Sequence, residues 1–349
     1  MNFFFSILCI IVFLFKTQTV FSENSIYDVN NVEVNGKINN YLDKKKLIQS
    51  SFQKAFIVFV NKTLLKKDAI SLYKTKISTI EDLVFSYQIV KRKKKDKIEK
   101  ILTTNIKFDQ KKISNFFALK GISYADVENI SLTLLPIFIK NKDVFMYADN
   151  FFYNNWLNSQ NETENSDDTL ISYSLGLEDI EDLRYINLNK DNLESIDVKK
   201  ITSLNNVKNY AILIIYFTEG KFRAYVKTNI KNKKIYKNIE LKIYPNNDTR
   251  TYEEALVTLK DEIIQIWKSQ NLIDVRTPSF LDLFLNVKKI DDYLKLSSIF
   301  NSIDLIEDYS VSIMTNEYVK IRIKYKGKLN RLRDKLVKGK VNINFTDNT

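Results

Sequence analysis

The chain has 349 residues, of which 44% are hydrophobic and 28% charged, and its formal net charge is +12. Its 6 glycines and 3 prolines are too few for a collagenous or extensively disordered chain, so we expect folded domains. It has no histidine, and its one cysteine is Cys9. These counts exclude a Ser-His-Asp triad, a histidine zinc site and an iron–sulfur cluster.

The N-terminus has the pattern of an export signal. An apolar run over Phe3 to Phe15, interrupted by Ser6, fits the roughly 7–15 residues of a signal-peptide core and is shorter than the ~20 residues that cross a bilayer. We therefore expect residues 1–22 to be a signal peptide that is cleaved after Ser22, which leaves an exported, periplasmic protein. An uncleaved N-terminal membrane anchor is the alternative, because Lys16 follows the apolar run and no basic residue precedes it.

The first module is expected over residues 23–141. Hydrophobic periodicity predicts, in order, a strand over 26–34, a long helix over about 40–65, a hairpin over 83–90 and 98–108, a helix over 111–120 ended by Gly121, and a closing strand over 132–139. This β-α-β-β-α-β order is that of the ferredoxin-like fold, in which two helices cover one face of an antiparallel sheet.

The middle module is expected over residues 142–274. The pattern predicts a polar surface loop over 158–168, a helix over 196–207, strands over 210–218, 221–229 and 235–244, and a long amphipathic helix starting near Thr251. We therefore expect an α/β domain with an antiparallel sheet and one long helix.

The last module is expected over residues 275–349. It is predicted to hold a strand over 281–287, a helix over 290–303, a hairpin over 309–315 and 318–325, a basic helix over 329–338 stopped by Gly339 in a left-handed C-cap, and a strand over 341–345. The order again is β-α-β-β-α-β, so an internal duplication is expected. The predicted fold class is α+β, with three small α/β modules of which the first and last are ferredoxin-like.

An acidic stretch is the candidate metal site. The sequence LEDIED places four carboxylates close together, namely Glu178, Asp179, Glu181 and Asp182. Such oxygen ligands suit Ca²⁺ or Mg²⁺, although the spacing of an EF-hand is missing and a solvated acidic turn is the alternative. We predict no catalytic residue and no cofactor. If the chain were an enzyme, these carboxylates would serve a carboxylate-dependent hydrolase or a metal-binding envelope enzyme.

A basic run is the candidate contact with an anionic surface. It joins the two strands of the first predicted hairpin and consists of Lys91, Arg92, Lys93, Lys94, Lys95 and Lys97. At a hairpin tip these charges could meet an anionic membrane surface, and a solvated hairpin end is the alternative. No aromatic residue interleaves the run as in a surface that stacks bases, so nucleic acid is not an expected partner.

Several stretches resemble an uncharacterised exported, periplasmic family of proteobacterial proteins that contain a domain of unknown function. The stretches are IYDVNNVEVNGKINNYLDKKKLIQSSFQKAF, LVFSYQIV, IKFD, FFALKGISY, SLTLLPIF, YADNFFYNNW, LEDIEDL, VKKIDDYLKLSSIFNSI and VKIRIKYKGKLNRLRDKL. They cover most of the chain after residue 22, mainly as a pattern of hydrophobic spacing. The resemblance implies periplasmic export and brings no catalytic residues with it.

The expected function is that of a non-enzymatic binding or assembly protein, an adaptor of the periplasm or cell envelope whose partners are envelope proteins. The sequence does not predict its oligomeric state. A secreted protein of an AT-rich eukaryotic parasite is another interpretation, since the chain carries glycosylation triplets at Asn61, Asn129, Asn161, Asn247 and Asn344.

Overall fold

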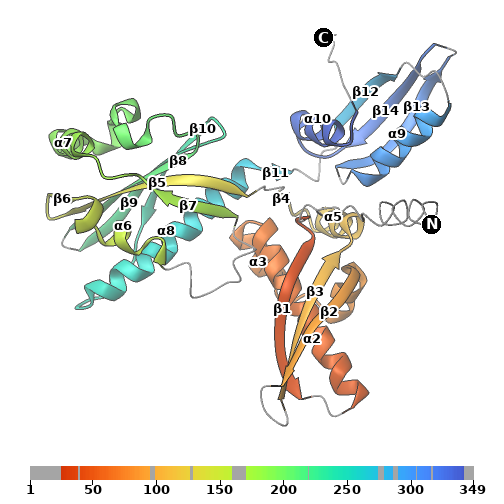
Figure 1. Ribbon diagram of the computed structural model, residues 1–349, viewed down its shortest axis with the longest axis horizontal. Coiled ribbons are helices and arrows are strands. Elements are labelled where there is room, and N and C mark those ends of the chain that lie inside the picture. The colour runs from red at the N-terminus through yellow and green to blue at the C-terminus, as the bar shows by residue number, and fades with distance from the viewer. Residues whose placement is uncertain are drawn as a thin grey trace, which may run out of the picture.

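The structure is a computed structural model, and it describes residues 25–37, 40–94, 99–125, 129–158, 170–218, 220–273, 279–285, 290–303, 305–315 and 317–341. Mixed helices and sheets form three lobes that meet in the middle of the molecule, which confirms the α+β class (Figure 1). The predicted signal segment 1–22 lies outside the described residues, as does most of the predicted loop over 158–168. In the part that is described, no helix has the length and hydrophobicity needed to cross a bilayer.

The first module is a three-stranded antiparallel sheet packed against helices. Its elements are β1 (Asp28–Lys37), α2 (Tyr41–Thr63), α3 (Lys66–Leu72), α4 (Ile77–Leu83), β2 (Val84–Lys94), β3 (Glu99–Phe108) and α5 (Gln110–Leu119). The strand order β1-β3-β2 is the ferredoxin-like order without its fourth strand. Asn40 and Asp109 begin α2 and α5 because each side chain accepts a hydrogen bond from a backbone N–H in the first turn.

The middle module is a six-stranded mixed sheet with helices on both faces. Its strands are β5 (Ile130–Lys140), β6 (Asp143–Phe145), β7 (Ile171–Leu175), β8 (Tyr210–Thr218), β9 (Lys221–Ile230) and β10 (Lys233–Glu240). Its helices are η1 (Tyr147–Asp149), α6 (Phe151–Asn155), α7 (Ile180–Leu188), η4 (Lys190–Ser195), η5 (Val198–Lys200), η6 (Thr202–Leu204) and α8 (Asp248–Gln270). One core lies between the sheet and α6 with α8, and a second lies between the sheet and α7 with the 3₁₀ turns.

The boundary expected between the first two modules is corrected by the place of the strand predicted over 132–139. This strand is β5, and it pairs with β8 and β7 in the middle sheet instead of closing the first one. Every residue of β5 from Leu134 to Ile139 is buried, on both faces of the sheet, as in a strand that has helices on either side. In the first sheet, by contrast, Phe85 and Tyr87 of β2 are 67% and 48% exposed, so that strand is not covered on both faces.

Two other expectations for the middle module are also corrected. The β8-β9-β10 meander is antiparallel as predicted, but β5 is parallel to both β7 and β8, so the sheet is mixed. The helix expected over 196–207 is instead the pair of 3₁₀ turns η5 and η6. Asp197 begins η5 by accepting the N–H of Lys199, which favours a tight turn over a continuous helix.

The last module repeats the topology of the first. Its elements are β12 (Ser279–Leu285), α9 (Ile290–Ser302), β13 (Ile306–Met314), β14 (Val319–Tyr325) and α10 (Leu329–Lys338). The sheet order β12-β14-β13 matches β1-β3-β2, so both modules share the order β-α-β-β-α with the third strand in the centre. The closing strand predicted over 341–345 lies outside the described residues beyond Val341.

Gly339 does end α10, but not in the conformation predicted. Its φ is −73°, and Lys340 takes the left-handed conformation with φ of 63°. Gly339 has a different reason to be small, because a Cβ there would lie 2.8 Å from the Cγ2 atom of Ile299. Gly121, by contrast, has a φ of +65° and is the left-handed residue after α5.

A two-stranded ladder ties the three modules together. β4 (Tyr124–Ala125) follows the first module and pairs with β11 (Leu272–Ile273), which follows α8, and both labels lie at the meeting point of the lobes in Figure 1. Tyr124 and Ile273 belong to a continuous hydrophobic core that includes residues of both the first and the last module. The outer modules therefore share one core, while the middle module has cores of its own.

Candidate functional site

Two of the four acidic residues of the sequence candidate, Asp179 and Asp182, bind backbone N–H groups, and the other two are exposed. Asp179 begins α7, since its Oδ1 accepts the N–H groups of Glu181 at 2.8 Å and Asp182 at 3.1 Å. Glu181 is exposed and pairs with Arg184 at 2.7 Å. Glu178 is exposed. Among the residues that the structure describes, no three acidic, cysteine or histidine side chains are grouped so that they could hold a metal ion.

Asp182 is fully buried and binds backbone. Its Oδ1 accepts the N–H of Thr202 at 2.5 Å and its Oδ2 accepts the N–H of Ser203 at 3.0 Å. These bonds hold η6 against α7. Both carboxylate oxygens are thus engaged in positioning the turn rather than in holding a ligand.

The basic run is not confined to the tip of the hairpin. Lys91, Arg92, Lys93 and Lys94 lie in β2, whose backbone pairs with β3 along this length. Lys95 and Lys97 lie outside the described residues. The contact with an anionic surface therefore stays a prediction from the sequence.

The last module offers a surface that the sequence motifs did not indicate. Side chains on β14 alternate, so Val319, Ile321 and Ile323 are buried under α9 and α10 while the side chains between them face the other way. Cross-strand pairing then places three rows of side chains on the outer face. The rows are Phe280–Lys324–Asp308, Asp282–Arg322–Ser310 and Phe284–Lys320–Ile313. We call these nine residues the open sheet face.

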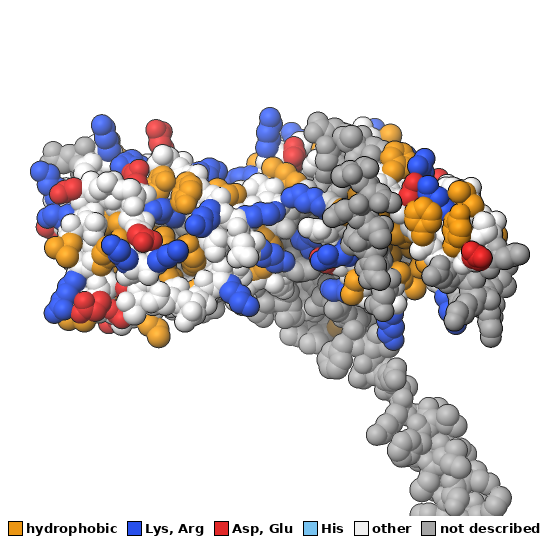
Figure 2. Space-filling view, turned by 90° about the horizontal axis from the view of Figure 1, so that it is seen from above, with side chains coloured by type: hydrophobic (Ala, Val, Ile, Leu, Met, Phe, Trp, Pro, Cys, Tyr) orange, Lys and Arg blue, Asp and Glu red, His pale blue; other side chains and the backbone are white. Residues whose placement is uncertain are grey.

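Aromatic side chains make up one border of the open sheet face. Phe280 and Phe284 on the edge strand β12 are 62% and 66% exposed. The ring of Phe284 lies 6.0 Å from that of Tyr318 and 5.3 Å from the Lys320 ammonium. Figure 2 shows exposed hydrophobic side chains beside basic ones on this module, at the right of the view. Two exposed phenylalanines on one strand lower the solubility of a protein. Neighbouring exposed apolar side chains of this kind are typical of a binding surface.

Cations occupy the centre of the open sheet face and outnumber the carboxylates that pair with them. Asp282 accepts two hydrogen bonds from Arg322, at 2.8 and 3.1 Å, and lies 3.1 Å from Lys320. These partners lower the pKa of Asp282 to about 2, with the Arg322 hydrogen bonds as the largest cause. Glu307 pairs with Lys324 at 3.2 Å and with the buried Lys326 at 2.6 Å. Asp308, whose Oδ1 accepts the N–H of Tyr309 at 2.9 Å, also lies opposite Lys324, so four cations stand against three carboxylates.

The sequence contained part of the signal for this surface. The alternation of Leu281, Leu283 and Leu285 indicates a half-buried strand, and the same alternation places Phe280 and Phe284 together on its other face. Their proximity to Lys320 and Lys324 depends on the register of β12 against β14, which local periodicity does not determine.

Comparison with protein-family models, with curated proteins and with solved structures found no match for this chain.

Proposed function

We propose that this chain is an exported, non-enzymatic binding protein of the cell envelope, and that its open sheet face holds an extended acidic segment of a partner protein. The observation that supports the proposal is the combination of two uncovered phenylalanines with a row of cations on one sheet face. The apolar rings would supply the buried centre of an interface, and the cations would select carboxylates at its border.

The charges favour an acidic partner. Arg322 and Lys324 keep 56% and 42% of their side chains exposed despite their ion pairs, so a ligand can still reach them. The whole chain carries a net charge of +12, which steers acidic partners toward it. Carboxylates of a partner would add to the three, Asp282, Glu307 and Asp308, that now lie among the four cations.

The geometry favours an extended segment. Phe280 and Phe284 are four residues apart on one strand, a distance of about 14 Å at the rise of a β-strand. Side chains of an extended peptide that point to one face repeat at about 7 Å, so alternate residues of the partner can contact both rings. About five residues of the partner would span the face.

Photo-crosslinking tests the proposal in cells that express the full chain. A benzoylphenylalanine at position 284 should form an adduct with a protein, and mass spectrometry should place the adduct in an acidic, extended segment. Benzoylphenylalanine in place of Leu119, a residue of the first module that is 89% exposed, is the matched control and should not form that adduct. Adducts with lipid, with a second copy of this chain, or none above the control would contradict the proposal.

A peptide of the identified segment then permits a measurement of affinity. Because both rings are exposed, Phe280→Ser with Phe284→Ser should leave the fold intact and weaken binding by at least about tenfold, which is about 1.4 kcal/mol. Leu119→Ser with Leu188→Ser removes two apolar side chains elsewhere that are at least as exposed, and it should leave the affinity unchanged. Binding should also weaken as salt is raised, since ions screen exposed charges.

Export is tested separately. The mass of the protein recovered from fractionated cells should correspond to a chain that begins at Glu23. A membrane-bound species that keeps Met1 would show an anchor, and a full-length cytosolic species would contradict export.

A further inference from the structure

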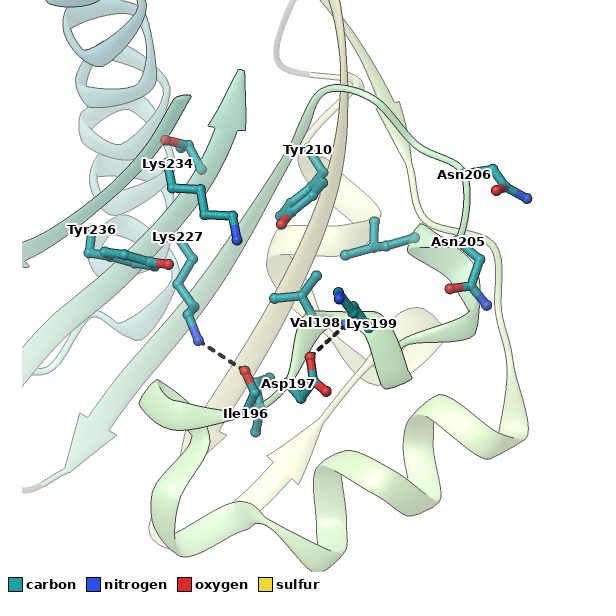
Figure 3. Close-up of a pocket in the computed structure, with 12 residues that line it drawn as sticks. Ile196, Asp197, Val198, Lys199, Asn205, Asn206, Tyr210, Lys227, Lys234 and Tyr236 are labelled. Atoms are coloured by element: carbon teal, nitrogen blue, oxygen red, sulfur yellow. Dashed lines mark hydrogen bonds between the residues drawn. The ribbon is translucent and has the colours of Figure 1, made fainter. Parts of the chain in front are cut away.

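A pocket of about 390 Å³ lies in the middle module, well separated in sequence from the open sheet face (Figure 3). One wall is formed by the strands β8, β9 and β10, and the other by η5 and the residues after η6. The volume is within the range of roughly 300–1,000 Å³ that is usual for pockets that bind small molecules.

The charged side chains in the pocket are mainly ammonium groups. Lys199, Lys227 and Lys234 line it, and the carboxylate among its lining residues is that of Asp197. Asp197 is already engaged, because its Oδ1 accepts the N–H of Lys199 at 3.1 Å. The lining therefore carries an excess of positive charge.

Lys227 is the pocket residue whose position is fixed most firmly. Its residue is only 7% exposed, and its Nζ donates to the carbonyl oxygens of Glu194 at 2.8 Å and Ile196 at 3.2 Å. An ammonium group has three N–H donors, so these two bonds fix its position and leave the third for a ligand. Burial lowers the pKa of Lys227, while the charges of Glu194 and Asp197 oppose that change. An anion beside this ammonium would stabilise its charged form.

The remaining lining suits an apolar or aromatic body. Tyr236 lies in the pocket wall, is 55% exposed, and has its ring parallel to that of Tyr225, at 5° and 6.4 Å between the ring centroids. Val198 and Leu204 line the opposite wall. Figure 3 shows the hydroxyl of Tyr210 and the ammonium of Lys234 pointing toward each other across the space.

We propose that this pocket binds a small organic anion, with its acidic group at Lys227, Lys234 and Lys199 and its apolar body against Tyr236, Val198 and Leu204. The proposal is independent of the open sheet face, which lies in another module. It adds a small-molecule site to a chain whose proposed function is to bind a protein segment.

Titration of the full chain with anilinonaphthalene sulfonate, a fluorescent aromatic anion, tests the proposal. We expect saturable binding that Lys199→Met with Lys234→Met weakens by about tenfold or more, because two charge-assisted contacts are lost. The matched control is Lys190→Met with Lys221→Met, two exposed lysines of the same module that do not line the pocket. It removes the same charge and should leave the affinity within about twofold.

Two further measurements show whether the dye binds in the pocket and through its sulfonate. N-phenylnaphthylamine, which lacks the sulfonate, should bind equally to the wild type and to the Lys199→Met, Lys234→Met variant. Phe280→Ser with Phe284→Ser should leave sulfonate binding unchanged, so failure of this site is distinguishable from failure of the open sheet face. The Lys227→Met variant should also bind the dye more weakly. Tryptophan fluorescence like that of the wild type shows that this variant is folded. Absence of saturable binding, equal loss in the lysine control, or dependence on Phe280 and Phe284 would overturn the proposal.

Discussion

Of the four buried charged residues in the described part of this protein, three bind backbone groups and one binds a carboxylate. Asp182 accepts two backbone N–H groups, and Lys227 and Lys268 each donate to two backbone carbonyls. The fourth, Lys326, is paired with a carboxylate, that of Glu307. A buried charge that bonds to backbone holds two segments in place. Asp182 of the acidic stretch has this role, because its two bonds hold η6 against α7.

Replacement of Asp182 should therefore reduce stability. Asp182→Asn substitutes an N–H₂ group for one carboxylate oxygen, so either Thr202 or Ser203 loses the acceptor of its buried N–H. The expected loss is about 1–3 kcal/mol of unfolding free energy, measured by urea denaturation. Glu181→Gln, which breaks only the exposed pair with Arg184, should cost at most about 0.5 kcal/mol. Equal losses in the two variants would contradict a structural role for Asp182.

Lys260 should give stability a specific dependence on pH. Burial lowers the pKa of this ammonium, which donates to the carbonyl of Trp156 at 2.6 Å, from 10.5 to about 8. Between these two values the unfolded chain binds more protons than the folded one, so the unfolding free energy rises with pH. Below about pH 8 both states are protonated and the contribution is constant.

The test compares the wild type with Lys260→Met. The unfolding free energy of the wild type minus that of the variant should increase between pH values of about 8 and 10, because the variant lacks this titration. Urea denaturation at several pH values measures the difference and cancels the titration of groups common to both proteins. A difference that is constant, or that falls with pH, would refute the assignment.

Among the elements, the ends of α5 and α10 show how closely the two outer modules match and where they differ. After α5, Gly121 and Ile122 donate to the carbonyls of Ala118 and Phe117. After α10, Lys340 and Val341 donate to the equivalent carbonyls, those of Val337 and Leu336. Both are Schellman motifs, but the left-handed position is glycine in the first and lysine in the second. The glycine of the second motif is one residue earlier.

Exchange of residues at the end of α10 tests this difference. Lys340→Gly should raise the unfolding free energy by about 0.5–1 kcal/mol, because glycine adopts a left-handed φ without strain. Gly339→Ala should lower it by about 1–3 kcal/mol, because the new Cβ would meet the Cγ2 of Ile299. Thermal unfolding of the two variants measures both effects, and a gain from Gly339→Ala would show that the contact relaxes at no cost.

The elements that could be predicted well are those with local periodicity. The helices α2, α5 and α8 and the hairpin of β13 and β14 follow from apolar spacing and turn residues within each segment. The strand that pairs with β5 could not be predicted. A continuous apolar run is expected of any strand that is buried on both faces, so the run does not identify its partner, and β8 lies roughly 80 residues away in the chain. For the same reason, the alternation within β12 predicts that Phe280 and Phe284 share a face, whereas the cations opposite them follow only from the long-range pairing with β14.

At the scale of the whole molecule, the outer modules and the middle module form distinct units of stability. One hydrophobic core contains residues of both outer modules, including Phe56 of the first and Phe300 of the last. The cores of the middle module are made of residues between Ala125 and Leu272. Polar contacts join α8 to the first module, such as the buried Lys268 on the carbonyl of Leu64 at 3.1 Å. The units are therefore adjacent but packed separately.

The two tryptophans of the chain make this organisation measurable. Trp156 and Trp267 are both buried in the middle module, so their fluorescence reports that module alone, whereas circular dichroism reports all three. Phe300→Ala should remove about 3–5 kcal/mol of stability from the shared outer core. It should lower the denaturant midpoint seen by circular dichroism and leave the fluorescence midpoint nearly unchanged.

A second variant establishes that the outer modules act as one unit. Phe56→Ala, in the first module, should shift the same circular dichroism transition as Phe300→Ala, because both residues belong to one core. Trp267 lies on α8 next to Lys268, which contacts the first module, so a small shift of the fluorescence midpoint is compatible with separate packing. A shift of the fluorescence midpoint equal to that of the circular dichroism midpoint is not. Equal shifts would mean that the polar contacts of α8 couple all three modules into one cooperative unit, because units that are stabilised by separate cores unfold in separate transitions.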